Sequence, residues 1–223
     1  MHEDENKMQQ MSAEFQKMVD DFFRIQCRYS AAMREIQTKL EILDDEFQLR
    51  HRRNPIHHMQ CRMKTIQSMM EKLRRKHHTV SMESAVENLR DIAGIRVICS
   101  YLQDVYTVAE LLTSQDDVKL LEMRDYVKFP KANGYRSLHL IVEIPVFLQE
   151  GRVNVPVEVQ LRTIAMDFWA SLEHAMRYKA EGEVPEDISL ELQEVGADIA
   201  LLDKRMQSLH DRISADEAKD KPT

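Results

Sequence analysis

The chain has 223 residues, of which 43% are hydrophobic and 31% charged, and its formal net charge is −7. This length allows one domain with helical extensions, and the acidic balance argues against a general nucleic-acid binder such as a DNA-binding protein. No stretch reaches the ~18 apolar residues of a membrane span, and the first residues (Met1–Glu5) are acidic, unlike a secretory signal, so we expect a cytoplasmic protein that does not enter a membrane.

The N-terminal segment, residues 1–53, has apolar residues at alternating spacings of three and four. This spacing is the heptad-like pattern of one or two long helices. The region ends at Asn54-Pro55, because a residue that precedes proline is disfavoured in the helical conformation. The stripe comprises Met8, Met11, Phe15, Met18, Phe22, Ile25, Tyr29, Ala32 and Ile36, and continues after one shifted step with Leu40, Leu43 and Phe47.

A second helix is predicted over residues 56–76, in the most basic part of the chain. Between Arg50 and Lys76 there are nine Lys or Arg residues and a single acid. This local excess suggests a specific polyanion such as a nucleotide, although a solvated helix face explains the charges equally well. Its apolar stripe is Met59, Met63, Ile66, Met70 and Leu73, and a polar stripe is formed by Lys64, Ser68 and Lys72, with Arg75 one step further on.

From residue 54 to 180 the pattern alternates between strands and helices. We therefore expect an α/β (α+β) core, built on a mixed β-sheet of about five strands flanked by helices. A turn at residues 149–152 predicts an antiparallel hairpin between the last two strands. The predicted strands are Ile95–Tyr101, Val118–Arg124, Ser137–Ile144 and Val153–Arg162, and the predicted helices are Asp104–Thr113 and Ile164–Lys179.

The C-terminal segment, residues 181–223, repeats the spacing of the N-terminal one and predicts another long helix. Two such stripes can pack on each other or on another subunit. A stripe this narrow is typical of a helix–helix seam, and we therefore expect a homo-oligomer. The C-terminal stripe is formed by Ile188, Leu192, Val195, Ile199, Leu202, Met206, Leu209 and Ile213.

The strand at residues 153–162 carries an unusual polar face. Successive side chains of a strand point to opposite sides of the sheet. The odd-numbered residues from Val153 to Leu161 are therefore ordinary core, whereas Glu158, Gln160 and Arg162 share the other side. A carboxylate, an amide and a guanidinium on one rigid element suit a site that holds a metal and a phosphate.

Two further segments supply groups of the same kind. Asp91 comes just before a buried strand, with Arg96 on its alternate face, and the loop at residues 128–139 places Lys131 and Tyr135 near a strand. No Gly-rich phosphate loop is present, so bound phosphates would depend on side chains and a metal. Because Mg²⁺ is usually held by one or two carboxylates and substrate phosphates, these groups indicate phosphoryl or nucleotidyl transfer.

Three motifs in this order resemble the synthetase domain of the RelA/SpoT family. They are Asp-Ile-Ala-Gly-Ile-Arg at 91–96, Asn-Gly-Tyr-Arg-Ser-Leu-His at 133–139, and Val-Glu-Val-Gln-Leu-Arg-Thr-Ile-Ala-Met-Asp-Phe-Trp at 157–169. The resemblance covers roughly residues 54–180 and implies a nucleotidyltransferase-like synthetase fold. The short length and helical flanks are similar to the small alarmone synthetases, with no hydrolase domain expected.

The resemblance implies a Mg²⁺-dependent GTP pyrophosphokinase. Such an enzyme moves the β,γ-pyrophosphate of ATP to the 3′-OH of GDP or GTP, which yields the alarmone (p)ppGpp and AMP. The resemblance further implies a homotetramer. It leaves open whether bound alarmone or RNA regulates the enzyme, and whether GDP or GTP is preferred.

Roles can be assigned to individual residues by matching the motifs of this family. Asp91 and Glu158 would hold Mg²⁺, Glu158 could also activate the 3′-OH, and Gln160 and Arg162 would brace the site. On the ATP side, the resemblance implies Arg62 and Arg96 around the adenine and Lys64, Ser68, Lys72 and Arg75 near the phosphates. On the GDP or GTP side it implies Tyr135 against the guanine, with Arg124, Lys131, Asn133 and His139, and with Asp167 either touching the base or capping a helix.

Two other functions remain open at this point. The same fold could transfer pyrophosphate to adenine nucleotides or to tRNA 3′ ends. Alternatively, the chain could be a non-catalytic, oligomeric RNA-binding module that uses the basic segment alone. Carboxylates that face the basic residues would repel RNA, which makes the second alternative the weaker one.

Overall fold

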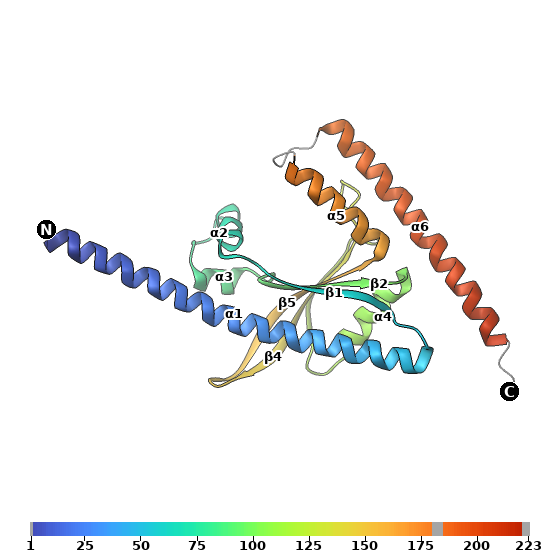
Figure 1. Ribbon diagram of the computed structural model, residues 1–223, viewed down its shortest axis with the longest axis horizontal. Helices are drawn as coiled ribbons and strands as arrows, with labels where there is room; N and C mark the ends of the chain where they lie inside the picture. Colours follow the sequence, from blue (N-terminus) through green and yellow to red (C-terminus); the bar gives the residue numbers. More distant parts are fainter. Residues whose placement is uncertain (1, 180–184, 220–223) are drawn as a thin grey trace.

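The computed structural model describes residues 2–179 and 185–219 and contains one mixed five-stranded sheet (Figure 1). The strands lie in the order β1-β2-β5-β4-β3, in which β2 and β5 are parallel and all other neighbours are antiparallel. The expected mixed sheet of about five strands is thus confirmed. The strands are β1 (Ile56–Met63), β2 (Ala93–Cys99), β3 (Lys119–Asp125), β4 (Leu138–Leu148) and β5 (Gly151–Thr163).

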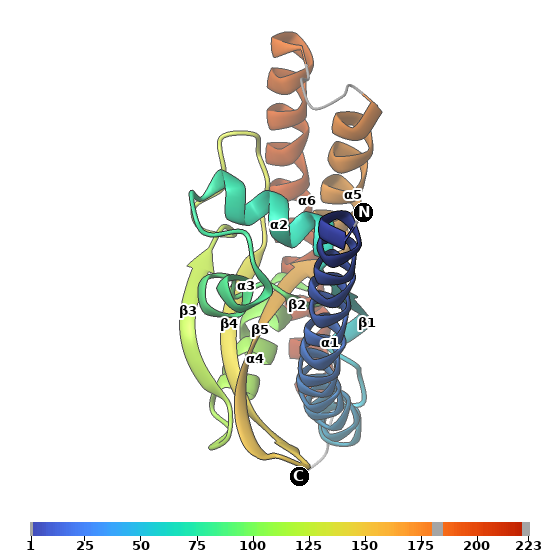
Figure 2. The same ribbon diagram turned by 90° about the vertical axis from the view of Figure 1, so that its left-hand side faces the viewer.

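Six helices surround this sheet in the described part of the chain. α5 and α6 lie side by side in both views of the molecule (Figures 1 and 2). None of the described helices combines the length and apolar character needed to cross a membrane. The helices are α1 (His2–His51), α2 (Ile66–Arg75), α3 (Met82–Asn88), α4 (Leu102–Thr113), α5 (Ile164–Lys179) and α6 (Glu186–Lys219).

The N-terminal stripe packs against the sheet, contrary to the expectation that it joins another helix or subunit. α1 is one continuous helix that contacts β1, β2, β4 and β5. Its buried residues belong to the same core as the apolar face of β5, so α1 and α4 close one side of the sheet. The buried positions of the stripe are Ile25, Tyr29, Ala32, Ile36 and Leu40, whereas the side chains of Met8, Met11, Phe15 and Met18 lie outside the described residues.

The prediction of a helix over residues 56–76 is wrong for the first half of that range. Residues 56–63 form the edge strand β1, which pairs with β2 so that Gln60 lies opposite Arg96 and Arg62 opposite Gly94. α2 begins only after Thr65, whose Oγ1 accepts a hydrogen bond from the backbone N of Ser68 at 3.2 Å. Apolar residues at positions 59, 63 and 66 fit the period of a helix, but pairing with a neighbouring strand overrides that local preference.

The other predicted elements are confirmed, with ends shifted by a few residues. β4 and β5 form the predicted hairpin, and α5 spans the predicted residues 164–179. The predicted C-terminal helix is α6, and residues 181–184 and 220–223 of the predicted segment lie outside the described ranges. Its apolar stripe is largely exposed: Val195 is 45% exposed, Leu202 50% and Ile213 62%.

Shortening a buried residue of α1 tests its place in the core. Leu40 is fully buried at 0% exposure, and we expect Leu40→Ala to lower the free energy of unfolding by about 2–5 kcal/mol. Leu49 on the same helix is 84% exposed, so the matched Leu49→Ala change should stay within about 0.5 kcal/mol. Chemical denaturation of both variants checks this, and equal effects would contradict a core-facing α1.

Candidate active site

The sheet register gathers polar side chains on the side opposite the apolar core. Glu158 of β5 lies beside Gly94 of β2, and Gln160 lies between Arg96 of β2 and His139 of β4. Residues opposite each other in a sheet point to the same face. Arg96, His139 and Glu158 therefore share one face of the sheet, and Arg62 joins it from β1, a strand that the sequence did not predict.

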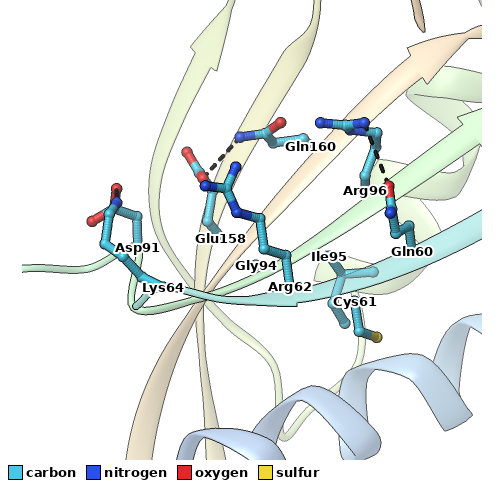
Figure 3. Close-up of a pocket in the computed structure, with 10 residues that line it drawn as sticks. All are labelled: Gln60, Cys61, Arg62, Lys64, Asp91, Gly94, Ile95, Arg96, Glu158 and Gln160. Atoms are coloured by element: carbon cyan, nitrogen blue, oxygen red, sulfur yellow. Dashed lines mark hydrogen bonds and ion pairs between the residues drawn. The ribbon is translucent and has the colours of Figure 1, made fainter. Parts of the chain in front are cut away.

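A cavity of about 520 Å³ opens on this face (Figure 3). Two acids, Asp91 and Glu158, line it together with the cations Arg62, Lys64 and Arg96. The residues come from β1, β2, β5 and the segments that follow β1 and precede β2. The cavity thus pairs carboxylates with a ring of cations, an arrangement suited to phosphates and a metal ion.

Asp91 is held by two lysines. Its Oδ2 atom lies 2.5 Å from the Nζ atoms of both Lys64 and Lys72, while its buried Oδ1 atom has no hydrogen-bond partner among the described residues. Burial alone would raise the pKa of this carboxyl, but the two lysine hydrogen bonds outweigh it and lower the pKa below its ordinary value. Asp91 is therefore a carboxylate with one oxygen free for a further ligand.

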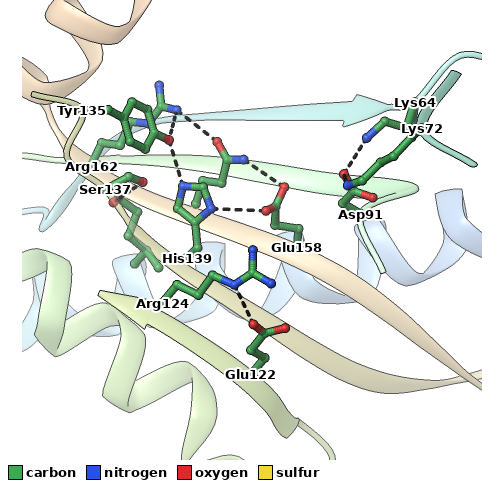
Figure 4. Close-up of polar contacts among 12 residues, drawn as sticks. Lys64, Lys72, Asp91, Glu122, Arg124, Tyr135, Ser137, His139, Glu158 and Arg162 are labelled. Atoms are coloured by element: carbon green, nitrogen blue, oxygen red, sulfur yellow. Dashed lines mark hydrogen bonds and ion pairs between the residues drawn. The ribbon is translucent and has the colours of Figure 1, made fainter. Parts of the chain in front are cut away.

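Glu158 stands at the end of a chain of hydrogen bonds (Figure 4). Its Oε1 lies 3.3 Å from Nδ1 of His139, whose Nε2 lies 2.8 Å from the hydroxyl of Tyr135. Nη2 of Arg162 donates to the same hydroxyl at 2.7 Å. Since an ionised carboxylate only accepts, Nδ1–H of His139 donates to Glu158, and in the neutral imidazole Nε2 then accepts from the hydroxyl of Tyr135.

The surroundings of Glu158 keep it ionised. Burial would raise the pKa of its carboxyl, but the hydrogen bonds from His139 and from Nε2 of Gln160, which donates at 2.9 Å, lower the pKa below the ordinary 4.5. The nearby charge of Asp91 acts in the opposite direction, since it raises the pKa. Glu158 is thus an oriented carboxylate that can accept a proton or bind a cation.

The two carboxylates fit a Mg²⁺ ion that is shared with substrate phosphates. Among the described residues no group of three or more His, Cys, Asp or Glu side chains could hold a metal. Mg²⁺ however needs only one or two protein carboxylates when phosphates complete its shell. Asp91 and Glu158 line the same cavity, and the buried Oδ1 of Asp91 has no hydrogen-bond partner among the described residues.

A second cavity of about 840 Å³ adjoins the first and shares Arg62, Arg96 and Gln160 with it. The loop before β4 contributes to its wall, and Nζ of Lys131 lies 4.7 Å from the ring centre of Tyr135. The remaining polar residues of its lining are Asn133, His139, Arg162, Ser171, Glu173, His174 and Arg177. The site therefore has room for two ligands that meet beside Glu158.

Asp167 joins the arginines of both cavities. Its Oδ1 accepts a hydrogen bond from Nη1 of Arg162 at 3.0 Å and lies 3.5 Å from Nη1 of Arg96. Burial, followed by the charge of Arg162, lowers the pKa of Arg96, and the Nε atoms of both arginines are buried without a hydrogen-bond partner in the described part of the chain. Asp167 offsets part of this positive charge, and two unsatisfied donors remain for a ligand.

Some predicted site residues lie outside the two cavities. Lys72 reaches Asp91 without lining either cavity. Ser68 contacts Thr65 at the start of α2, and Arg75 is exposed at its end. Arg124 is exposed and pairs with Glu122, with Nε 2.6 Å from Oε1, although it lies opposite His139 in the sheet (Figure 4).

The structure also adds residues that sequence reasoning did not assign. Gln60 lines the first cavity, and its Oε1 lies 3.5 Å from Nη1 of Arg96. Gln60 was not assigned a role because it belongs to β1, which was predicted as part of a helix. On α5, Glu173 accepts a hydrogen bond from Nδ2 of Asn133 at 3.0 Å and pairs with Arg177. The four-residue spacing of Glu173 and Arg177 could have indicated this ion pair, because it places both side chains on one face of a helix.

Comparisons with known proteins agree on the relatives of this chain. A family profile described as "Region found in RelA / SpoT proteins" matches residues 61–183. The GTP pyrophosphokinases YwaC and YjbM of Bacillus subtilis are 41% and 34% identical to the chain, which the matches cover to 83% and 85%, and they cover 88% and 89% of those proteins. The crystal structure of small alarmone synthetase 1 from Bacillus subtilis bound to its product pppGpp aligns with a TM-score of 0.79 at 34% identity, over 86% of this chain and 97% of that one.

Proposed function

This chain belongs to the RelA/SpoT family, and from that premise we propose that it is a GTP pyrophosphokinase, an ATP:GTP 3′-diphosphotransferase. It transfers the β,γ-pyrophosphate of ATP to the 3′-OH of GDP or GTP and produces (p)ppGpp and AMP. One observation carries the proposal. The carboxylate of Glu158 lines the first cavity and contacts His139 of the second, so it stands where a donor and an acceptor nucleotide would meet.

Glu158 serves as the base in this reaction. It takes the proton of the acceptor 3′-OH, whose oxygen bonds to the β-phosphorus of ATP while the bond to the α-phosphate oxygen breaks and AMP leaves. The hydrogen bond from His139 orients the carboxylate, and the chain through Tyr135 to Arg162 holds that imidazole in one tautomer. A bound Mg²⁺, held by Asp91 and Glu158, would neutralise charge on the phosphates.

The first cavity is the ATP site in this proposal. Arg62 and Arg96 face the adenine, for which the planar guanidinium groups are suited. Lys64 and Lys72 serve both the phosphates and Asp91, since each already contacts that carboxylate. Ser68 and Arg75 of α2 lie further out and would act only on the distal phosphates.

The second cavity is the site for GDP or GTP. Tyr135 stacks on the guanine, and a base on the face that Lys131 covers has to displace its ammonium group. The displaced Lys131 is then free to pair with acceptor phosphates, together with His139 and the outlying Arg124. Asn133 and Asp167 complete the site, while Gln160 and Arg162 brace the two cavities.

We also propose that the protein acts as a homo-oligomer, in line with the expected tetramer. The exposed apolar stripe of α6 supports this, because contiguous exposed apolar surface is typical of protein interfaces. Residues 1–53, 54–180 and 181–223 would then form an N-terminal helical segment, a catalytic domain and an oligomerisation segment. Its nucleotide substrates favour a cytoplasmic location, and regulation by alarmone or RNA stays a prediction.

The decisive assay incubates the protein with Mg²⁺, ATP labelled in the γ-phosphate and one acceptor at a time, and separates the products by chromatography. We expect labelled (p)ppGpp and equimolar AMP with GDP or GTP, and no transfer after chelation of Mg²⁺. Transfer only to ADP or to a tRNA 3′ end would contradict the choice of acceptor. RNA binding without any turnover would favour a non-catalytic module.

A further inference from the structure

The inner side of α6 is fixed to the catalytic part of the chain along its length. The carbonyl of Leu192 accepts a hydrogen bond from Nε1 of Trp169 at 2.9 Å, and Oδ2 of Asp203 accepts one from Oγ1 of Thr163 at 2.8 Å. Further along, the ring of His210 stacks on Tyr101 with 4.1 Å between the ring centres. α6 is therefore held in one position relative to α5 and the sheet (Figure 1).

Between the first two of these contacts, α6 presses directly on a loop of the second cavity. A Cβ atom added to Gly196 of α6 would lie 3.0 Å from the carbonyl oxygen of Gly134 and 3.3 Å from its Cα. Conversely, a Cβ atom at Gly134 would lie 3.2 Å from Cα of Gln193. Both neighbours are backbone atoms, so neither can move aside by a change of rotamer, and the two main chains touch because both residues are glycine.

The contact between Gly196 and Gly134 affects the position of side chains that line the second cavity. The backbone N of Gly134 donates to the carbonyl of Lys131 at 2.9 Å, and the backbone N of Tyr135 donates to Oδ1 of Asn133 at 3.2 Å. A shift of Gly134 therefore moves the whole acceptor loop, which we define as residues 131–135. Among the described residues, no hydrogen bond or ion pair joins Asp91 or Lys64 of the first cavity to this loop or to Gly196.

Helix propensity gives no reason for a glycine at position 196. Gly196 lies in the interior of α6, and glycine is among the poorest helix formers. Its helical φ needs no special freedom, because the positive φ values among the glycines belong to Gly134 and Gly151. The absence of a side chain therefore serves the approach of α6 to the acceptor loop.

We propose that Gly196 is a positioning residue that sets the acceptor loop and thereby the affinity for GDP or GTP, so that α6 forms part of the acceptor site. The inference rests on the proposed function, since it concerns the acceptor nucleotide of that reaction. A side chain at position 196 displaces the loop from α6, which misplaces Lys131, Asn133 and Tyr135. Lys64, Lys72 and Asp91 of the ATP side contact one another and not this loop, so the phosphate end of the ATP site keeps its geometry.

The test compares Gly196→Ala and Gly196→Val with the control Ala197→Val, an exposed neighbour on the same helix. The KM for GDP or GTP should rise severalfold for alanine and ~10-fold for valine, since an overpacked contact costs about 1–3 kcal/mol and about 1.4 kcal/mol is tenfold in affinity. The KM for ATP should change less than about twofold, as should both KM values of Ala197→Val. Circular dichroism and the Tm of each variant check that it folds.

Three outcomes decide the proposal. A selective rise of the acceptor KM in folded Gly196→Ala supports it, even if the valine variant fails to fold. Unchanged acceptor KM values in folded variants, or equal rises for ATP and acceptor, overturn it. An inactive parent protein would instead contradict the proposed function. Calorimetric measurement of GDP binding would then decide the role of Gly196, by the ratio of the Kd of each variant to the Kd of the parent.

Discussion

Glu158→Gln is expected to lower guanine-dependent AMP release by on the order of 10³-fold, because loss of a positioned general base typically costs 10²–10⁴-fold. Glutamine keeps the size of the side chain and one oxygen acceptor, so His139 and the sheet should hold it in place. What disappears is the negative charge that accepts the proton and helps to hold Mg²⁺. Steady-state AMP release, with circular dichroism as a check of the fold, measures the effect.

The matched control is Glu143→Gln on the neighbouring strand β4. The side chain of Glu143 forms a long ion pair with Lys119, 3.8 Å between Nζ and Oε1, and lines neither cavity of the candidate active site. The activity of Glu143→Gln should remain within about twofold of that of the parent protein. Near-normal turnover by folded Glu158→Gln would show that another group takes the proton.

Asp91→Asn is expected to lower kcat/KM by about 10²-fold, since a few kcal/mol of metal-ion charge stabilisation correspond to that factor. The asparagine leaves the ammonium groups of Lys64 and Lys72 without their shared carboxylate. It also removes the charge behind the unpartnered Oδ1 atom. The Mg²⁺ concentration that gives half-maximal rate should therefore rise, and a titration of Mg²⁺ at saturating nucleotide measures it.

An exposed aspartate provides the control for this second prediction. Asp117 pairs with Lys39 at 2.8 Å on the surface, and its side chain is 48% exposed. Asp117→Asn should leave both the rate and the requirement for Mg²⁺ unchanged. If Asp91→Asn loses activity but keeps the parental half-maximal Mg²⁺ concentration, Asp91 orders the lysines without binding the metal.

The polar face of β5 could be predicted from local spacing alone. Alternation along a strand has a period of two, so Glu158, Gln160 and Arg162 had to share one face once the valines were assigned to the core. The hairpin turn before β5 was equally local. The motifs that resemble the RelA/SpoT family lie in similarly short segments, and the family can therefore be identified from the sequence alone.

Strand β1 could not be predicted from local spacing in the same way. Its residues are mostly exposed and show no strict alternation, because an edge strand is constrained by its hydrogen bonds more than by burial. The basic residues of that region were consequently placed on one helix. In the structure Arg62 lies on the strand, Lys64 lies in the following turn and Lys72 lies on α2, yet both lysines meet at Asp91.

The sequence by itself determined the class of fold, the family, the shared face of Glu158, Gln160 and Arg162, and the helical character of the terminal segments. All of these follow from interactions between residues that are close in the chain. Only the tertiary structure decided that α1 packs on the sheet, that Glu158 receives its hydrogen bond from His139, and that Gly196 meets Gly134. Those contacts join residues distant in sequence, and their geometry depends on strand pairing and helix packing, which no local pattern encodes.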